Sequence, residues 1–178
     1  MSEYSGNLEL LLPHRPQDPG TSDNTHQNSF HASPRPKHFS KTADAVILRV
    51  MEIKRINTPD APKAGGHYSQ ATVYNGLVFV AGQLSIDPVT GEKKLGSIEE
   101  QTEQALKNVH AILKAAGSDW DRVLKVNISV ADINLWEAVN QVYSRVLGEN
   151  RPARAVIPCG PLHYGFLIEI EAVAATDM

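Results

Sequence analysis

One stretch of the chain, residues 97–131, changes its hydrophobic period from that of a helix to that of a strand. Ser97 and Glu100 have the spacing of a capping box, and apolar residues then recur at helical spacing until Gly117. Apolar and polar side chains alternate over residues 123–131, which predicts a strand with one buried face. Each segment has one apolar face to bury, so a helix packed on a sheet is required. The apolar face of this strand is expected to consist of Leu124, Val126, Ile128 and Val130.

A second helix and further strands are predicted around that stretch. Asn75-Gly76 between two apolar runs predicts a β-hairpin, and Asp132 and Gly148 are expected to begin and end the second helix. The order strand, hairpin, helix, strand, helix, strand, strand predicts a two-layer α+β domain, with two helices on one face of a mixed sheet. The other expected strands are residues 52–56, 72–74, 77–84, 154–157 and 166–174. The expected buried stripe of the second helix is Leu135, Ala138, Val139, Val142, Tyr143 and Val146.

The sheet face opposite the helices must be solvated or buried by another subunit, because two helices cover only one side. Several strands carry further apolar residues, which favours a partner on that face. These residues are Val73, Val78, Val80, Leu167 and Val173.

The first 50 residues differ in composition from the rest of the chain. They contain five of the 11 prolines and four of the seven histidines, and residues 17–42 are almost entirely polar or proline. Such a segment buries too little apolar surface to offset the entropy lost on ordering. We therefore predict a disordered or dispensable extension over residues 1–50 and one folded domain over residues 51–178, with Met51 as an alternative start.

Charge, cysteine content and hydropathy exclude several classes of protein. The first 50 residues hold five basic and five acidic side chains, so the whole net charge of −3 belongs to the folded part, and a nucleic acid is not an expected partner. The single cysteine, Cys159, excludes an internal disulfide and a multi-thiolate zinc site, and neither a metal nor a cofactor is expected. No apolar run approaches the roughly 20 residues of a membrane-spanning helix. A cytoplasmic protein without a membrane partner is expected.

Two side chains near the end of the chain are candidates for chemistry. Arg154 begins an apolar strand between two alanines, where a guanidinium can bind a carboxylate with two hydrogen bonds; an arginine in solvent or in a salt bridge is the alternative. Glu169 and Glu171 share one face of the last strand. A partly buried carboxylate there would have a raised pKa and act as an acid or base, whereas a solvated pair would be surface charge only.

Eight short blocks occur in the order and spacing of one protein family. They are Ala-Gly-Gly-His-Tyr-Ser-Gln-Ala (64–71), Val-Ala-Gly-Gln-Leu (80–84), Asp-Pro-Val-Thr-Gly-Glu (87–92), Gln-Thr-Glu-Gln-Ala-Leu-Lys-Asn-Val (101–109), Ala-Ala-Gly (115–117), Asn-Gln-Val-Tyr (140–143), Arg-Pro-Ala-Arg (151–154) and Ile-Glu-Ile-Glu-Ala-Val-Ala (168–174). Residues 51–175 therefore resemble the Rid/YjgF family of reactive-intermediate deaminases, often labelled endoribonuclease L-PSP.

This resemblance implies a chorismate-mutase-like fold that assembles as a homotrimer, with sites between subunits. It implies hydrolysis of 2-imino acids, or of their enamine tautomers, to 2-oxo acids and ammonia. A non-catalytic trimer that binds or senses small carboxylates is the alternative. An endoribonuclease, the older label, is disfavoured by the net negative charge and by the lack of paired catalytic histidines.

The resemblance also assigns roles to five residues. Arg154 is expected to grip the substrate carboxylate and Glu169 to handle the attacking water, so both are candidate catalytic residues. Tyr68, Gly82 and Asn140 are expected to complete the substrate site together with Arg154.

Several positions depart from the family pattern. His67 stands where the family usually has proline, Ala81 where deaminases often have serine, and Val156 where they often have cysteine. The loop of residues 160–166 is apolar where relatives often carry a charged turn, and its aromatic residues are His163, Tyr164 and Phe166. These changes are expected to line the pocket. The preferred imino acid is therefore open, and the aromatic loop predicts a larger or more apolar one.

Overall fold

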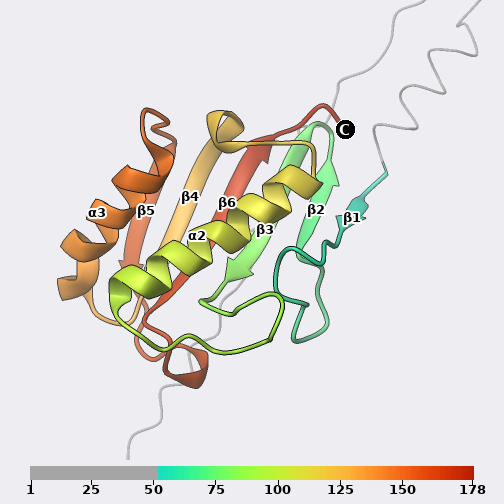
Figure 1. The fold of residues 1–178 in the computed structure, drawn as a ribbon. Helices are drawn as coiled ribbons and strands as arrows, with labels where there is room; N and C mark the ends of the chain where they lie inside the picture. The colour runs from blue at the N-terminus through green and yellow to red at the C-terminus, as the bar shows by residue number, and fades with distance from the viewer. Residues whose placement is uncertain (1–51) are drawn as a thin grey trace, which may run out of the picture. The chain divides into compact units, whose positions relative to one another are not determined.

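The computed structural model describes residues 52–178. The predicted extension of residues 1–50 and Met51 lie outside the described residues, and what was expected of them stays a prediction. Within the described part, a six-stranded sheet carries two helices on one face (Figure 1). This confirms the predicted two-layer α+β architecture, while the homotrimer stays a prediction.

The elements follow in the expected order. The strands are β1 (Lys54–Ile56), β2 (Ala71–Tyr74), β3 (Leu77–Gln83), β4 (Val123–Val130), β5 (Ala153–Pro158) and β6 (Ile168–Ala175). The helices are α2 (Ile98–Ala115) and α3 (Trp136–Leu147), and short 3-10 turns cover Trp120–Arg122, Ile133–Leu135 and His163–Gly165. Across the sheet the order is β1-β2-β3-β6-β4-β5, in which β4 and β5 are parallel and all other neighbours antiparallel.

Local signals in the sequence account for the hairpin and for the start of α2. Asn75 and Gly76 both have positive φ angles, 49° and 74°, as a tight two-residue hairpin requires. The Ser97 hydroxyl accepts a hydrogen bond from the Glu100 N–H at 3.3 Å, and the Glu100 carboxylate accepts one from the Ser97 N–H at 3.0 Å. The predicted capping box is therefore confirmed.

The predicted apolar face of β4 is wrong at its first residue. The pairing of β4 with β6 shifts between Val123 and Lys125, so Leu124 is the extra residue of an irregularity in the ladder. Leu124 is 51% exposed, and Val123 is buried in its place. Strict alternation does not foresee such an insertion, because one extra residue reverses the faces on which the preceding side chains lie. Beyond the shift, Val126, Ile128 and Val130 are buried as expected.

The second helix begins later than expected. The Asp132 side chain accepts a hydrogen bond from the Asn134 N–H at 2.9 Å and caps the turn Ile133–Leu135 rather than α3. The α3 helix starts at Trp136 without a side-chain cap, and it ends at Gly148, whose φ of 58° favours glycine. Its buried residues are Val139, Val142, Tyr143 and Leu147, while Leu135, Ala138 and Val146 are partly buried.

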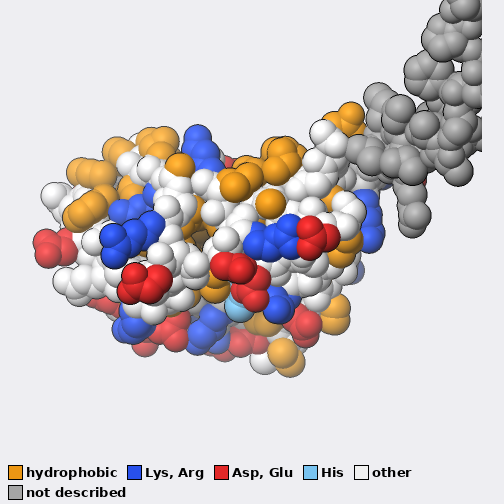
Figure 2. Space-filling model, turned by 90° about the horizontal axis from the view of Figure 1, so that it is seen from above, with side chains coloured by type: hydrophobic (Ala, Val, Ile, Leu, Met, Phe, Trp, Pro, Cys, Tyr) orange, Lys and Arg blue, Asp and Glu red, His pale blue; other side chains and the backbone are white. Residues whose placement is uncertain are grey.

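The two faces of the sheet differ in what they expose. Val73, Val78 and Val80 were expected to favour a partner on the free face, but they are buried in the core beneath the helices. Phe79, which pairs with Val173 on β6, lies on the helix-free face and is 44% exposed. In the view from above, hydrophobic side chains gather on the helix-free face of the sheet, and charged side chains gather on the face that carries the helices (Figure 2). No helix within residues 52–178 is long and apolar enough to span a membrane.

Candidate active site

The five candidate residues fall into two groups on opposite faces of the sheet. Glu169 pairs with Ser129 of β4, and both side chains lie on the helix-free face. Arg154 is in register with Val126, whose side chain is buried beneath the helices. Paired residues of neighbouring strands point to the same side, so in one chain the sheet lies between Arg154 and Glu169. Tyr68 and Gly82 join Glu169, and Asn140 joins Arg154.

The Glu169 group lines a cavity of about 460 Å³. Gly82 lies where β3 departs from regular pairing with β6, and a Cβ at this position would overlap the Glu169 carboxylate. Glycine is therefore required here for the carboxylate to occupy its place beside β3. The other lining residues are Pro62, Lys63, Gly65, Gly66, Tyr68, Gln70, Gln83, Leu84, Ile86, His163 and Tyr164.

The charge of Glu169 is set by its position on β6. Alternation along this strand buries Ile168 and Ile170 and leaves the Glu169 side chain half-buried on the other face, as expected. Burial raises the pKa of Glu169, and the like charge of Glu171 raises it further, while His163 opposes the shift. A cavity carboxylate whose pKa is raised holds a proton more readily than an ordinary glutamate, which suits a group that both accepts and donates protons.

The Tyr68 side of the cavity depends on a residue that sequence reasoning missed. Tyr68 itself is exposed, and its hydroxyl accepts a hydrogen bond from the Gly65 N–H at 3.2 Å. The buried Gln70 side chain fastens the loop that precedes it: its amide nitrogen donates to the carbonyls of Thr58, Ala61 and Pro62, and its oxygen accepts from the Thr58 N–H at 2.6 Å. In the sequence, the only indication of this role is that a glutamine, Gln70, shortly precedes a predicted strand, and a glutamine there is equally typical of an exposed position.

The Arg154 group lines a second cavity, of about 450 Å³, between β5 and α3. The guanidinium donates a hydrogen bond to the Asn140 side-chain oxygen at 2.8 Å, and its central carbon lies 4.4 Å from the centre of the Tyr143 ring. Asn140 and Tyr143 are one turn apart on α3, so a single helix face holds the guanidinium from two directions. Among residues 52–178, no carboxylate forms an ion pair with Arg154, and none lines this cavity. The salt-bridge alternative is therefore wrong for the described chain.

Tyr143 is a second residue that sequence reasoning missed, because its helical spacing predicted only a buried position. It is 7% exposed, and its hydroxyl has no hydrogen-bond partner within the described residues. Burial raises the pKa of Tyr143, and the nearby Arg154 charge opposes the shift. The ring rather than the hydroxyl therefore contacts the functional side chain.

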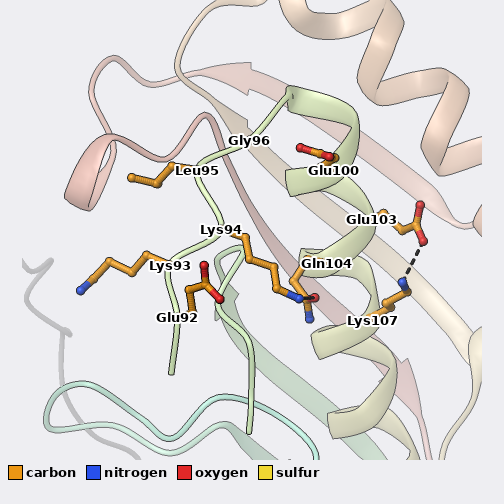
Figure 3. Close-up of a pocket in the computed structure, with 9 residues that line it drawn as sticks. All are labelled: Glu92, Lys93, Lys94, Leu95, Gly96, Glu100, Glu103, Gln104 and Lys107. Carbon is orange, nitrogen blue, oxygen red and sulfur yellow. Dashed lines mark hydrogen bonds and ion pairs between the residues drawn. The ribbon is translucent and has the colours of Figure 1, made fainter. Parts of the chain in front are cut away.

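A third cavity, of about 450 Å³, lies between residues 92–96 and α2 and contains none of the candidate residues (Figure 3). The long side chains around it bind one another. The Lys107 ammonium nitrogen lies 2.8 Å from a Glu103 carboxylate oxygen, and the Lys94 ammonium donates a hydrogen bond to the Gln104 side-chain oxygen at 2.9 Å. We interpret it as a solvated groove. Lys93 points away from α2 in this view.

The positions that depart from the family pattern lie mostly outside the two cavities. His67, Ala81 and Val156 line neither of them within one chain, and the expectation that they line the substrate pocket stays a prediction. Phe166 is buried and also does not line the Glu169 cavity, whereas His163 and Tyr164 do. Cys159 is exposed and belongs to neither cavity.

Comparisons with known proteins match most of the described part of the chain to one protein family. A family model described as Endoribonuclease L-PSP matches residues 58–176. A RutC family protein of Pyrococcus horikoshii is 45% identical over 119 residues, which is 67% of this chain and 94% of the relative. The human 2-iminobutanoate/2-iminopropanoate deaminase is 44% identical over 119 residues, which is 67% of this chain and 87% of the relative.

Solved structures are similar over the same part of the chain. RidA from an Antarctic Psychrobacter species is 38% identical with a TM-score of 0.66, and the match covers 68% of this chain and 98% of that one. Escherichia coli TdcF with bound serine is 32% identical with a TM-score of 0.66, and the match covers 70% of this chain and 99% of that one. The fold is thus shared with both.

Proposed function

The chain belongs to the endoribonuclease L-PSP family, also called the Rid/YjgF family, and from that premise we propose that it is an imine deaminase. Its substrates are 2-imino acids or their enamine tautomers, and its products are 2-oxo acids and ammonia. The observation that carries the proposal is the half-buried Glu169 carboxylate, which lines a cavity and for which Gly82 leaves room. The names of the mammalian relatives, 2-iminobutanoate/2-iminopropanoate deaminases, support this reaction class.

Glu169 has the chemistry that imine hydrolysis requires. Water attacks the carbon of the protonated C=N bond and passes one proton to the Glu169 carboxylate, which leaves a carbinolamine. The protonated Glu169 then returns that proton to the nitrogen. The C–N bond breaks, ammonia leaves with the hydroxyl proton as ammonium, and the 2-oxo acid remains. A raised pKa suits this exchange, because the same group must act first as a base and then as an acid.

Arg154 provides the complementary role of binding. Both substrate and product carry a carboxylate next to the reacting carbon, and a guanidinium can bind its two oxygens with parallel hydrogen bonds. Asn140 and Tyr143 fix the Arg154 guanidinium, so less freedom is lost when the substrate binds. The structural relative with bound serine, a molecule that also carries a carboxylate, is consistent with this role.

We propose further that each active site forms between two copies of the chain in a homotrimer. In one chain the sheet separates Arg154 from Glu169, and one small imino acid must reach both. A neighbouring subunit on the helix-free face would bring its Arg154 group toward the Glu169 cavity. The exposed apolar surface of that face, which includes Phe79, supports such an interface.

A trimer that only binds small carboxylates is the alternative function, and the structural relative that holds serine gives a reason to keep it. Both functions use Arg154, but only the enzyme needs Glu169 as a proton carrier. Against a nuclease, the folded part has a net charge of −3, and neither cavity contains a pair of histidines.

A coupled assay separates these functions. A pyridoxal-phosphate-dependent dehydratase releases 2-imino acids in the cuvette, and their decay is followed with and without the protein. The enzyme proposal predicts faster decay, and it predicts that the Glu169→Gln variant abolishes the acceleration. Micromolar binding of 2-oxo acids without acceleration of any imine would contradict it and favour the sensor.

A further inference from the structure

The turn between β5 and β6 holds an aromatic residue in an unusual backbone conformation. Tyr164 has φ of 57° and ψ of 14°, the left-handed region that a bulky side chain rarely adopts. Its ring is not withdrawn into the core, because the residue is 67% exposed. A strained position with an exposed aromatic ring is typical of a place where the ring contacts something outside its own chain segment.

Neighbouring side chains fix the Tyr164 ring at this place. The ammonium of Lys93, which points away from α2, lies 4.4 Å from the centre of the ring (Figure 3 shows Lys93). The buried Phe166 ring meets it edge to face at 6.4 Å between centres, and His163 lies beside it at 6.2 Å. Three side chains thus neighbour the ring, which we call the Tyr164 wall.

This wall belongs to the Glu169 cavity. Tyr164 and His163 line the cavity together with the apolar side chains of Leu84 and Ile86. His163 is close enough to Glu169 for its charge to act on the pKa of that carboxylate.

We propose that the Tyr164 wall receives the side chain of the substrate and directs the site toward 2-imino acids with larger apolar side chains, such as those derived from leucine or methionine. This inference rests on the proposed deaminase function. Once the imine carbon is beside Glu169, a longer apolar side chain gains contact with Tyr164 and Ile86, whereas a methyl group leaves that surface in water. An apolar pocket separates substrates that differ by a few methylenes by about ten-fold or more in kcat/KM.

The test is the ratio of kcat/KM for the leucine-derived imine to that for the alanine-derived imine. We expect a ratio of at least about ten in the natural protein. Tyr164→Asn keeps a residue that tolerates the left-handed conformation but removes the aromatic surface, and it should reduce the ratio about ten-fold. Tyr164→Phe keeps the ring and should keep most of the preference. Tyr164→Gly adopts the left-handed conformation without strain and should reduce the ratio as much as Tyr164→Asn does. The inference can therefore be tested even if the asparagine variant does not fold.

The outcomes separate this inference from the function on which it rests. If the natural protein hydrolyses no imine, the proposed function fails. If it hydrolyses imines but prefers the alanine-derived one, or if Tyr164→Asn and Tyr164→Gly leave the ratio unchanged, the deaminase stands and the Tyr164 wall is overturned. A reduced ratio in both variants with a retained ratio in Tyr164→Phe supports the wall.

Discussion

The cavity around Arg154 and the cavity around Glu169 are built in different ways. One turn of α3 holds the Arg154 guanidinium through Asn140 and Tyr143, so a permanent charge sits on a rigid element. The Glu169 cavity combines a strand with loops, and the charge there changes with pH because burial raises the pKa of the carboxylate. In each chain a permanent cation and a carboxylate with a raised pKa therefore lie on opposite faces of one sheet.

The largest effect should come from the Glu169 cavity. Glu169→Gln keeps the shape of the side chain but cannot carry a proton, so we expect kcat to fall by about 10²–10⁴-fold. Binding of a 2-oxo acid should be spared, because the carboxylate is bound on the Arg154 side. The coupled assay measures the first effect and calorimetric titration the second.

Glu171→Gln is the matched control for that variant. Glu171 lies on the same face of β6, is exposed, and accepts a hydrogen bond from the Asn127 side chain at 3.4 Å. Its substitution should change kcat little. Normal turnover in Glu169→Gln together with loss in Arg154→Ala would show that Glu169 is not the proton carrier.

The next effect should come from the Arg154 cavity. Arg154→Lys replaces the planar fork with a point charge, and Arg154→Ala removes the charge, so both should lower kcat/KM by roughly ten-fold or more. Unlike Glu169→Gln, both should also weaken 2-oxo-acid binding. Arg151→Ala removes a cation from the same cavity wall and is the control. An equal loss in Arg151→Ala would mean that general positive charge, and not the Arg154 fork, binds the substrate.

A smaller effect is expected at Tyr143, which acts through Arg154. Tyr143→Leu removes the ring beneath the guanidinium and should weaken 2-oxo-acid binding by about 0.5–2 kcal/mol. Tyr143→Phe keeps the ring and should retain binding. It should also raise the free energy of unfolding by about 1 kcal/mol, because a buried hydroxyl without a partner is costly. Equal losses of binding in both variants would assign the role to the hydroxyl.

The smallest effects should appear in pH profiles. The Glu169 carboxylate must be ionised to accept a proton from water, so the acid limb of kcat/KM should lie above the ordinary glutamate value of 4.5. A folded-state pKa above the unfolded value means that stability is lost as pH rises through the folded pKa. Glu169→Gln should therefore raise Tm slightly at pH 8 relative to the natural protein and leave it unchanged at pH 4. A Tm difference that is the same at both values would contradict the raised pKa.

The sequence predicted most of the fold because its local signals are strong. The Ser97 capping box, the Asn75-Gly76 hairpin and the alternation that puts Glu169 opposite Ile168 and Ile170 are all read within a few residues. The irregularity at Leu124 could not be predicted, since it depends on how β4 pairs with a strand that follows much later in the chain.

Local patterns pointed to Arg154 and Glu169 as candidates but not to the layout of the candidate site, and Tyr68, Gly82 and Asn140 followed only from the family resemblance. Arg154 and Glu169 lie on opposite faces of the sheet because of the registers in which β5 and β6 pair with β4. No local sequence pattern encodes those registers. The roles of Gln70 and Tyr143 depend on tertiary contacts for the same reason. Local patterns therefore identified the charged groups, while the fold decided which of them share a cavity.

The proposed homotrimer requires that one chain supplies Arg154 and another supplies Glu169 to each site. Co-expression of the Arg154→Ala chain with the Glu169→Gln chain tests it, because each variant alone lacks one half of every site. If sites form between adjacent subunits of a closed ring, random mixing restores about a quarter of them with both groups intact. We predict that the mixed oligomer recovers about that fraction of natural activity in the coupled assay, which is more than either variant retains alone, since Arg154→Ala should keep about a tenth or less and Glu169→Gln far less. Activity that stays at the level of the separate variants would contradict a site shared between chains.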